Sequence, residues 1–418
     1  MEKLHKGWVM LVFVMLTVIA CLGFGRFSFG AILPFMKAGL AFDYRQAGAI
    51  GSSIFLGYLI SVTLVGYVVI RFGAKKVIVL SLLLTAAGMF LTGRAPGFGI
   101  AYLGCLIMGL GTGGANLPAM GLISRWFAPV KKGMAMGIAM SGSGFGIVFS
   151  GFVVPRLVAL GQEDGWRTSW FVLATLVVVV AVINLLFLKS SPEQLGLLPV
   201  GQAVSLEQVP EKPIAAKKTS QHSIYKNPLI WRMGFIYFLW GFSYLVFSTF
   251  LVDYLINDLS FANELAGKLF AIVGFASILS GFIWGAISDR LGRFLVLAVV
   301  FCVQASMLAA LSFTKNPGII ALEIAVYGIT LWGVPAIMTA SIADVTETKY
   351  FTVAIGFVTI FFSVGQFISP YLTGFIIEST GKYLVAFLVS AGLSLVGGFS
   401  ALLLHATRRR AVKASNDS

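Results

Sequence analysis

The chain has 418 residues, of which 58% are hydrophobic and only 11% are charged, and its formal net charge is +14. Soluble chains carry about a quarter charged residues, so this composition excludes an ordinary soluble protein and predicts one that crosses a membrane many times. The basic residues flank apolar runs and do not gather on one face. This distribution argues against nucleic acid as a partner and favours the lipid bilayer.

Twelve segments satisfy the requirement that a transmembrane helix has about 20 mostly apolar residues. They cover residues 8–35, 45–70, 77–94, 98–124, 133–160, 168–188, 231–256, 264–287, 294–314, 318–343, 350–377 and 383–405. The long polar stretch between the sixth and seventh segments is rich in proline and lysine, as is typical of a linker. We predict an all-α membrane protein with an N-terminal six-helix bundle (1–188), a cytoplasmic linker (189–230), a C-terminal six-helix bundle (231–405) and a cytoplasmic tail (406–418).

The two halves of the chain resemble each other. Gly73 and Gly292 follow the second and eighth segments, and Pro118 and Pro335 lie in the fourth and tenth. The sequence separation within the glycine pair agrees with that within the proline pair to within two residues. Such a repeat predicts two pseudo-symmetric bundles with a binding site between them, as in secondary transporters. Most of the 30 lysines and arginines fall on the side of the termini, which places both termini in the cytoplasm.

The loop after the eighth segment, residues 285–293, reads Gly-Ala-Ile-Ser-Asp-Arg-Leu-Gly-Arg. It closely resembles the signature loop of the major facilitator superfamily, and the likeness extends over essentially the whole chain. In that family the charged residues of the loop lock the inner ends of neighbouring helices. The resemblance assigns this gating role to Asp289, Arg290 and Arg293. The N-terminal copy keeps Arg71 but has Ile70 where the family has an acidic residue, so we expect weaker gating there.

Two further stretches resemble the branch that contains monocarboxylate porters and oxalate–formate antiporters. They are Arg125-Trp126-Phe127 with Lys131–Gly142 before and within the fifth segment, and Gly165-Trp166-Arg167 before the sixth. Many monocarboxylate transporters carry a substrate-binding arginine on the eighth segment, but residues 269–287 contain no charge. The resemblance therefore implies transport of a small organic anion with the cation supplied elsewhere.

Arg26 is the cation that the first segment supplies. An ionised side chain inside a bilayer costs at least roughly 2.5–3.5 kcal/mol, so something must offset that cost. Gly23 and Gly30 lie at i−3 and i+4 and would leave room for a cavity or a close helix on the face of the guanidinium. We expect Arg26 to bind the substrate anion. The alternatives are an internal ion pair with Glu323 or Asp253, and extension of the side chain to the outer interface.

Other polar and aromatic residues complete the predicted substrate site. Asn116 lies in the glycine-rich fourth segment and would orient the substrate. Tyr327 and Thr330 lie one turn apart on the tenth segment, and Trp240 and Tyr244 share a face of the seventh. For each of these residues, a purely structural contact between helices is the alternative.

Two acidic residues within the spans are candidates for proton coupling, because apolar surroundings favour the protonated form of a carboxyl group. Glu323 lies about 9 Å from the outer end of its helix, at ~1.5 Å per residue, and Asp253 lies near the outer end of the seventh segment. The alternative for Glu323 is an ion pair that closes an outer gate, for example with Arg156. Gln304 and Gln366 are interpreted as contacts between helices.

We find no phosphate-binding loop, no nucleophile with a base and no cluster of metal ligands, so we predict neither an enzyme nor a cofactor. We predict a monomeric secondary transporter of the cytoplasmic membrane. It would move a small monocarboxylate-like anion with a proton by alternating access between the two bundles. Proton-driven efflux of hydrophobic or drug-like compounds is the alternative function, and a transporter-like receptor is a third.

Overall fold

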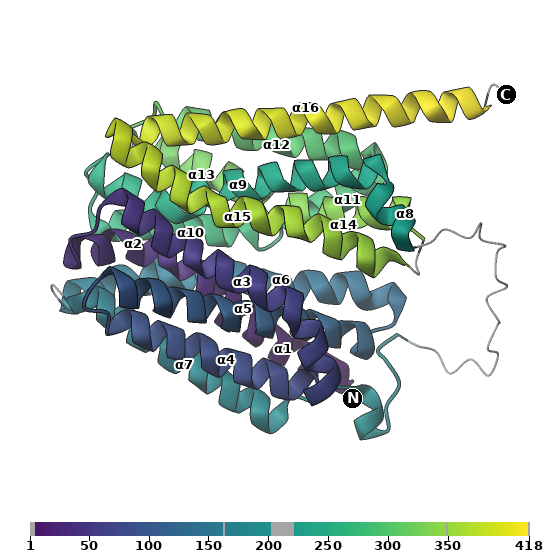
Figure 1. Ribbon diagram of the computed structural model, residues 1–418, viewed down its shortest axis with the longest axis horizontal. Helices are drawn as coiled ribbons and strands as arrows, with labels where there is room; N and C mark the ends of the chain where they lie inside the picture. The colour runs from purple at the N-terminus through teal and green to yellow at the C-terminus, as the bar shows by residue number, and fades with distance from the viewer. Residues whose placement is uncertain (1–4, 162–163, 202–220, 348–349, 417–418) are drawn as a thin grey trace.

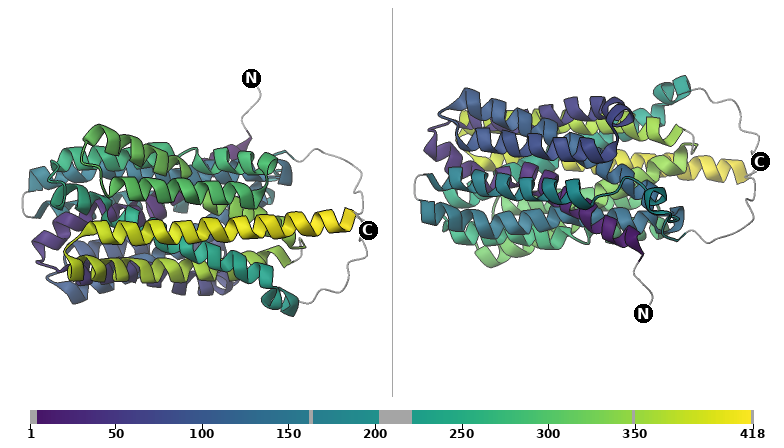
Figure 2. Two further views of the ribbon diagram at one scale, coloured as in Figure 1. Left: turned by 90° about the horizontal axis from the view of Figure 1, so that it is seen from above. Right: turned by 90° about the horizontal axis from the view of Figure 1, so that it is seen from below.

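The computed structural model describes residues 5–161, 164–201, 221–347 and 350–416 and is almost entirely helical. Eleven helical stretches are long and apolar enough to cross a membrane, and the bent pair α10 and α11, which meet at 41°, makes a twelfth. This confirms the predicted twelve-helix fold. Figures 1 and 2 show the two halves lying side by side, with both ends of the chain at the same end of the molecule.

The first half contains six crossings. Its elements are α1 (Lys6–Val18), the π-helix η1 (Ile19–Phe27) and α2 (Ser28–Gly39), which together form the first crossing, then α3 (Tyr44–Phe72), α4 (Ala74–Gly93), α5 (Phe98–Trp126), α6 (Pro129–Gly161) and α7 (Gly165–Phe187).

The second half follows a short 3-10 helix (Pro192–Leu195) and α8 (Gln221–Lys226). Its elements are α9 (Pro228–Asn257), α10 (Asn263–Ser277), α11 (Ser280–Leu291), α12 (Arg293–Leu311), α13 (Pro317–Leu331), α14 (Gly333–Val345), α15 (Phe351–Thr380) and α16 (Tyr383–Asn416). The last helix continues past the predicted end of its span at residue 405, and it projects beyond its neighbours in Figure 1.

We call the end of the molecule that carries both termini the terminal face, and the end that carries the loops after α2, α4, α9, α12 and α15 the opposite face. The two matched turns lie at the terminal face. Gly73 and Gly292 end α3 and α11 with φ angles of +81° and +97°, which side chains with a Cβ rarely adopt. The repeat seen in the sequence therefore marks two turns that require glycine.

The tenth crossing is broken at Trp332, between α13 and α14, and the eighth is broken between α10 and α11. The two breaks face each other. The Trp332 backbone N–H donates to the Ser280 hydroxyl (3.0 Å), and the Trp284 indole donates to the Ile329 carbonyl (2.8 Å). Side chains thus satisfy backbone groups that the breaks release, which is the condition for irregular backbone at membrane depth.

Candidate functional site

Arg26 lies in the last turn of the π-helix η1, and only 6% of its surface is exposed. The wider turn is visible in the backbone, because the Ser28 N–H donates to the Gly23 carbonyl five residues earlier. The expectation that Gly23 and Gly30 share the face of Arg26 assumed a regular α-helix. In the structure Gly23 packs on Gly146 of α6 and Gly30 packs on the Ser248 carbonyl of α9, so both mark close helix neighbours.

The guanidinium of Arg26 lies among aromatic rings. Its carbon is 4.5 Å from the ring centre of Phe55 and 4.9 Å from that of Tyr58, and its Nη2 donates to the Tyr244 hydroxyl at 2.8 Å. Arg26 forms no ion pair with any carboxylate of the described residues, and its Nε has no partner. The side chain is thus a buried cation that ring faces and one hydroxyl stabilise without neutralising its charge.

Residues from both halves support this arrangement. The amide of Gln366 on α15 donates to the same Tyr244 hydroxyl, so the residue interpreted as a helix contact also borders the cation. On the other side, the Asn116 amide lies 3.5 Å from the Tyr58 hydroxyl, at the limit of a hydrogen bond. The site therefore lies where the two halves meet, near the middle of the spans.

Four rings of the second half stack beside the cation, and we call Tyr237, Trp240, Tyr244 and Phe362 the aromatic stack. Trp240 lies 4.5 Å from Tyr244 with planes 15° apart, and Phe362 lies 4.5 Å from Tyr237 with planes 14° apart. Trp332, at the break of the tenth crossing, meets Trp240 edge-on at 6.4 Å. The sequence placed Trp240 and Tyr244 on one face correctly, but it did not indicate Phe55, Tyr58 or Phe362, which are ordinary aromatic residues within apolar segments.

Five buried polar atoms around the cation lack a hydrogen-bond partner, and we call them the unpartnered atoms. They are Arg26 Nε, Asn116 Oδ1, Trp240 Nε1, Trp332 Nε1 and Gln366 Oε1. A buried polar group without a partner costs about 1–3 kcal/mol. Their concentration around one cation is the property that a site for a polar, anionic ligand requires.

For Tyr327 and Thr330 of the tenth crossing, the structure gives contacts with other helices or with their own helix and none with Arg26. The Tyr327 ring packs on Phe247 with centroids 4.0 Å apart, and its buried hydroxyl has no partner. The Thr330 hydroxyl donates to the Tyr327 carbonyl (2.7 Å), so it is engaged with its own helix. Gln304 donates to the Thr330 carbonyl (3.2 Å), a contact between helices as the sequence suggested.

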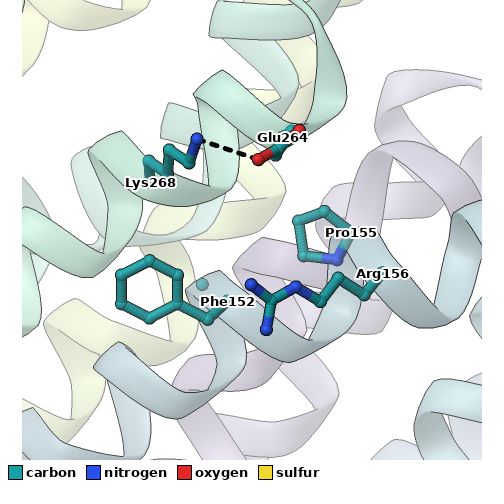
Figure 3. Close-up of a pocket in the computed structure, with 6 residues that line it drawn as sticks. Phe152, Pro155, Arg156, Glu264 and Lys268 are labelled. Atoms are coloured by element: carbon teal, nitrogen blue, oxygen red, sulfur yellow. Dashed lines mark ion pairs between the residues drawn. The ribbon is translucent and has the colours of Figure 1, made fainter.

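Glu323 lies away from the cation, toward the opposite face. It is 7% exposed, its Oε1 accepts from the Thr314 hydroxyl at 2.8 Å, and its Oε2 has no partner. Among the described cations none forms an ion pair with it, Arg156 included. Figure 3 shows Arg156 in a shallow pocket between α6 and α10, facing the exposed Glu264–Lys268 ion pair (2.8 Å).

Asp253 is fully buried within a polar cluster near the opposite face. Its carboxylate pairs with Lys37 (3.7 Å) and accepts from Asn257 (2.7 Å) and from the Tyr383 hydroxyl. The Tyr383 hydroxyl oxygen lies 2.8 Å from that of Tyr44. We call these five residues the closure cluster, because they join α2 and α3 of the first half to α9 and α16 of the second.

Further bonds between the halves lie in the same region. The Tyr44 N–H donates to Glu378 (2.9 Å), and the Tyr371 N–H donates to the Ser52 hydroxyl (3.0 Å). Apart from the bond between Arg26 and Tyr244, every hydrogen bond and ion pair found between the halves of the described chain lies on this side of the cation. The halves are therefore closed at the opposite face.

The charged residues of the signature loop stay within the second half. Arg293 pairs with Asp289, and its Nε donates to Asp344 of α14 at 3.0 Å. Arg71 and Arg290 are exposed and take part in no ion pair among the described residues. The loop thus ties α11, α12 and α14 together without bridging the two halves in this conformation.

Replacing Arg26 by methionine should leave the unfolding temperature of the purified protein unchanged or higher. The substitution removes a buried charge, whose burial opposes folding by at least the amount that the ring contacts and one hydrogen bond return. The matched control is Arg167→Met, since Arg167 donates to the Gly93 and Ala95 carbonyls (3.0 and 2.8 Å). That control should lower the temperature, and a comparable fall for Arg26→Met would show that Arg26 is structural.

Comparison with known proteins places this arrangement in a family. The Major Facilitator Superfamily profile matches residues 15–339 and 325–418. A probable sulfoacetate transporter of Cupriavidus necator is 25% identical over 91% of this chain and 90% of its own length. The hexuronate transporter of Bacillus subtilis is 24% identical, covering 90% of each chain, and monocarboxylate transporter 12 of Xenopus laevis is 25% identical, covering 87% and 80%.

Solved structures agree on the fold. The nucleoside transporter NupG matches with a TM-score of 0.73 at 14% identity, covering 94% of this chain and 99% of its own. A bacterial homologue of the human lysosomal transporter Spinster, in an inward-facing and occupied conformation, also matches with a TM-score of 0.73 at 14% identity, covering 96% and 97%. The twelve crossings, the repeated glycine turns and the profile match over both halves agree: the chain belongs to the major facilitator superfamily.

Proposed function

We propose that the protein is a secondary transporter of a small organic anion, which Arg26 binds between the two halves. The observation that carries this proposal is the buried guanidinium, which has no carboxylate partner among the described residues and borders both halves. Inside a membrane protein such a charge marks a substrate pathway more often than a structural contact. The relatives support an anion, because their names specify sulfoacetate, hexuronate and monocarboxylate.

Neighbouring residues would divide the work of binding. Tyr244 bonds to the guanidinium and Gln366 bonds to the Tyr244 hydroxyl, while Asn116 and Trp240 would offer their unpartnered atoms to the ligand. Tyr327 would offer its unpartnered hydroxyl to the ligand. Thr330 would stabilise the backbone of the same helix through its hydrogen bond to the Tyr327 carbonyl.

The same proposal includes a coupled proton. Protonation of Asp253 would remove its charge attraction to Lys37 and so weaken the closure cluster. Glu323, with one carboxylate oxygen free of partners, is the second candidate carrier. Co-transport of one anion with one proton would move no net charge, which avoids work against the membrane potential.

The terminal face would lie in the cytoplasm of a bacterial-type cell membrane, because lysine and arginine concentrate on that side. When the halves rock, the opposite face would open as the terminal face closes. In that state Arg71, Asp289, Arg290 and Arg293 would act as the inner gate, and one chain would suffice for the cycle.

Efflux of hydrophobic compounds is the second candidate function, and the aromatic stack is the observation that favours it. The two functions differ in the charge of the cargo. A transporter of neutral hydrophobic compounds would not depend on the charge of Arg26.

Uptake into proteoliposomes tests the proposal. Labelled lactate, glucuronate and sulfoacetate are supplied with an imposed pH gradient, and at least one should accumulate. Arg26→Met should abolish that uptake, and Glu323→Gln or Asp253→Asn should remove its dependence on the gradient. Uptake that survives Arg26→Met would contradict the role of Arg26 in binding the anion.

Accessibility of the opposite face tests the closure cluster. In a background with Cys21, Cys105 and Cys302 replaced by serine, Ser52→Cys places a thiol at a site that is 4% exposed in the closed state. Adding Asp253→Asn should speed its reaction with an impermeant maleimide several-fold, because asparagine keeps the size of the side chain but lacks the charge.

Glu264→Gln is the control, since it removes an acid from an exposed surface pair. It should leave the labelling rate unchanged. Equal rates for all three proteins would mean that the pair between Lys37 and Asp253 does not hold this face closed.

A further inference from the structure

We propose that the substrate is a monovalent, hydroxylated organic acid of the sugar-acid type, with one carboxylate and several hydroxyl groups. This inference rests on the proposed function and narrows its substrate class. It differs from the expectation of a simple monocarboxylate, and it comes from the charge of the site and from the unpartnered atoms.

The charge of the site admits one anionic group. Arg26 is the only ionised side chain among the residues that form the contacts described around it, and the others are aromatic rings or amides. A second carboxylate or sulfonate on the ligand would be buried without a cation. Burying an unpaired charge costs far more than burying an unpaired dipole, so a dianion should bind poorly.

The unpartnered atoms require more than a carboxylate. Three of them belong to N–H donors, on Arg26, Trp240 and Trp332, and two are the free ends of the Asn116 and Gln366 amides. A carboxylate only accepts hydrogen bonds, whereas a hydroxyl group both donates and accepts. Hydroxyl groups can therefore pair with either end of an amide as well as with the indole N–H groups.

The arrangement of these atoms also excludes a ligand with a single polar end. They come from η1, α5, α9, the break after α13, and α15, so both halves contribute them. Trp332 lies 6.4 Å from Trp240 and 6.5 Å from Tyr244, between ring centres. A carboxylate has only two oxygen atoms and cannot donate, so it cannot pair with all five atoms, and an apolar body would leave the others unpaired.

Thermal stabilisation of the purified full-length protein by matched ligands tests the inference, since a ligand of the folded state raises its apparent stability. The matched pairs are glucuronate with cyclohexanecarboxylate, and gluconate with hexanoate; the members of a pair differ in their hydroxyl groups. Glucarate, a dianion, and glucose, which is neutral, test the effect of the ligand's charge. The hydroxylated monoacids should reach the same stabilisation at concentrations at least about tenfold lower than their partners, because each hydroxyl group that pairs removes the cost of a buried polar atom without a partner.

Substitutions that each remove one hydrogen-bonding group test whether the preference for hydroxylated acids comes from the unpartnered atoms. Trp332→Phe and Trp240→Phe keep an aromatic ring but lose the N–H, and Asn116→Leu loses the amide. Each should weaken binding of glucuronate about tenfold and leave binding of cyclohexanecarboxylate unchanged. Trp231→Phe is the control, because the Trp231 indole already donates to the Tyr225 carbonyl (2.7 Å).

The outcomes separate the inference from the proposed function. If cyclohexanecarboxylate binds as tightly as glucuronate, or glucarate as tightly as either, the inference is wrong while the anion proposal stands. If the tryptophan variants fold and bind both acids like the unaltered protein, the assignment to the unpartnered atoms is wrong. If glucose binds as tightly as glucuronate, or none of the acids binds, the proposed function itself fails.

Discussion

A guanidinium buried among aromatic rings, with no carboxylate beside it, is the constraint on which the rest of this structure depends. Burial of Arg26 costs several kcal/mol in apolar surroundings, and the faces of Phe55 and Tyr58 with the Tyr244 hydroxyl return part of that cost without neutralising the charge. The positive charge of Arg26 is therefore not neutralised by any described carboxylate, and this is the basis for proposing an anion site there. Arg26 lies in the last turn of a π-helix, a local irregularity that is frequent at functional sites.

The first and seventh crossings connect this cation to closure of the protein. Arg26 contacts Tyr244, Gly30 packs on Ser248, and Lys37 pairs with Asp253, so three successive contacts run along the two helices toward the opposite face. A ligand that pulls Tyr244 and Arg26 together would act on the same helix pair that carries the closure cluster. We propose that binding and gating are linked in this way, because closely packed helices transmit small shifts.

Local patterns in the sequence sufficed for the fold. Apolar length predicts the twelve crossings, and the separation of Gly73 from Gly292 predicts the repeat because both turns need a positive φ. The cost of Arg26 identifies the candidate cation, but its surroundings could not be predicted. Phe55 lies on the next crossing and Tyr244, which bonds to Gln366, lies in the other half, and only helix packing brings their rings to Arg26. The π-helix also interrupts the regular α-helical register of the first crossing. The pairing of Lys37 with Asp253 depends on the same long-range packing.

The most direct test of the account compares the binding of an acid with that of its neutral amide. Affinities of glucuronate and glucuronamide are measured for the unaltered protein and for Arg26→Met. We predict that the unaltered protein prefers the acid by about a hundredfold or more, as a desolvated charge pair allows. The Arg26→Met variant should lose this preference while it keeps the contacts to the hydroxyl groups. An unaltered protein that binds acid and amide equally, or a variant that retains the preference, would contradict the claim that Arg26 is the anion site.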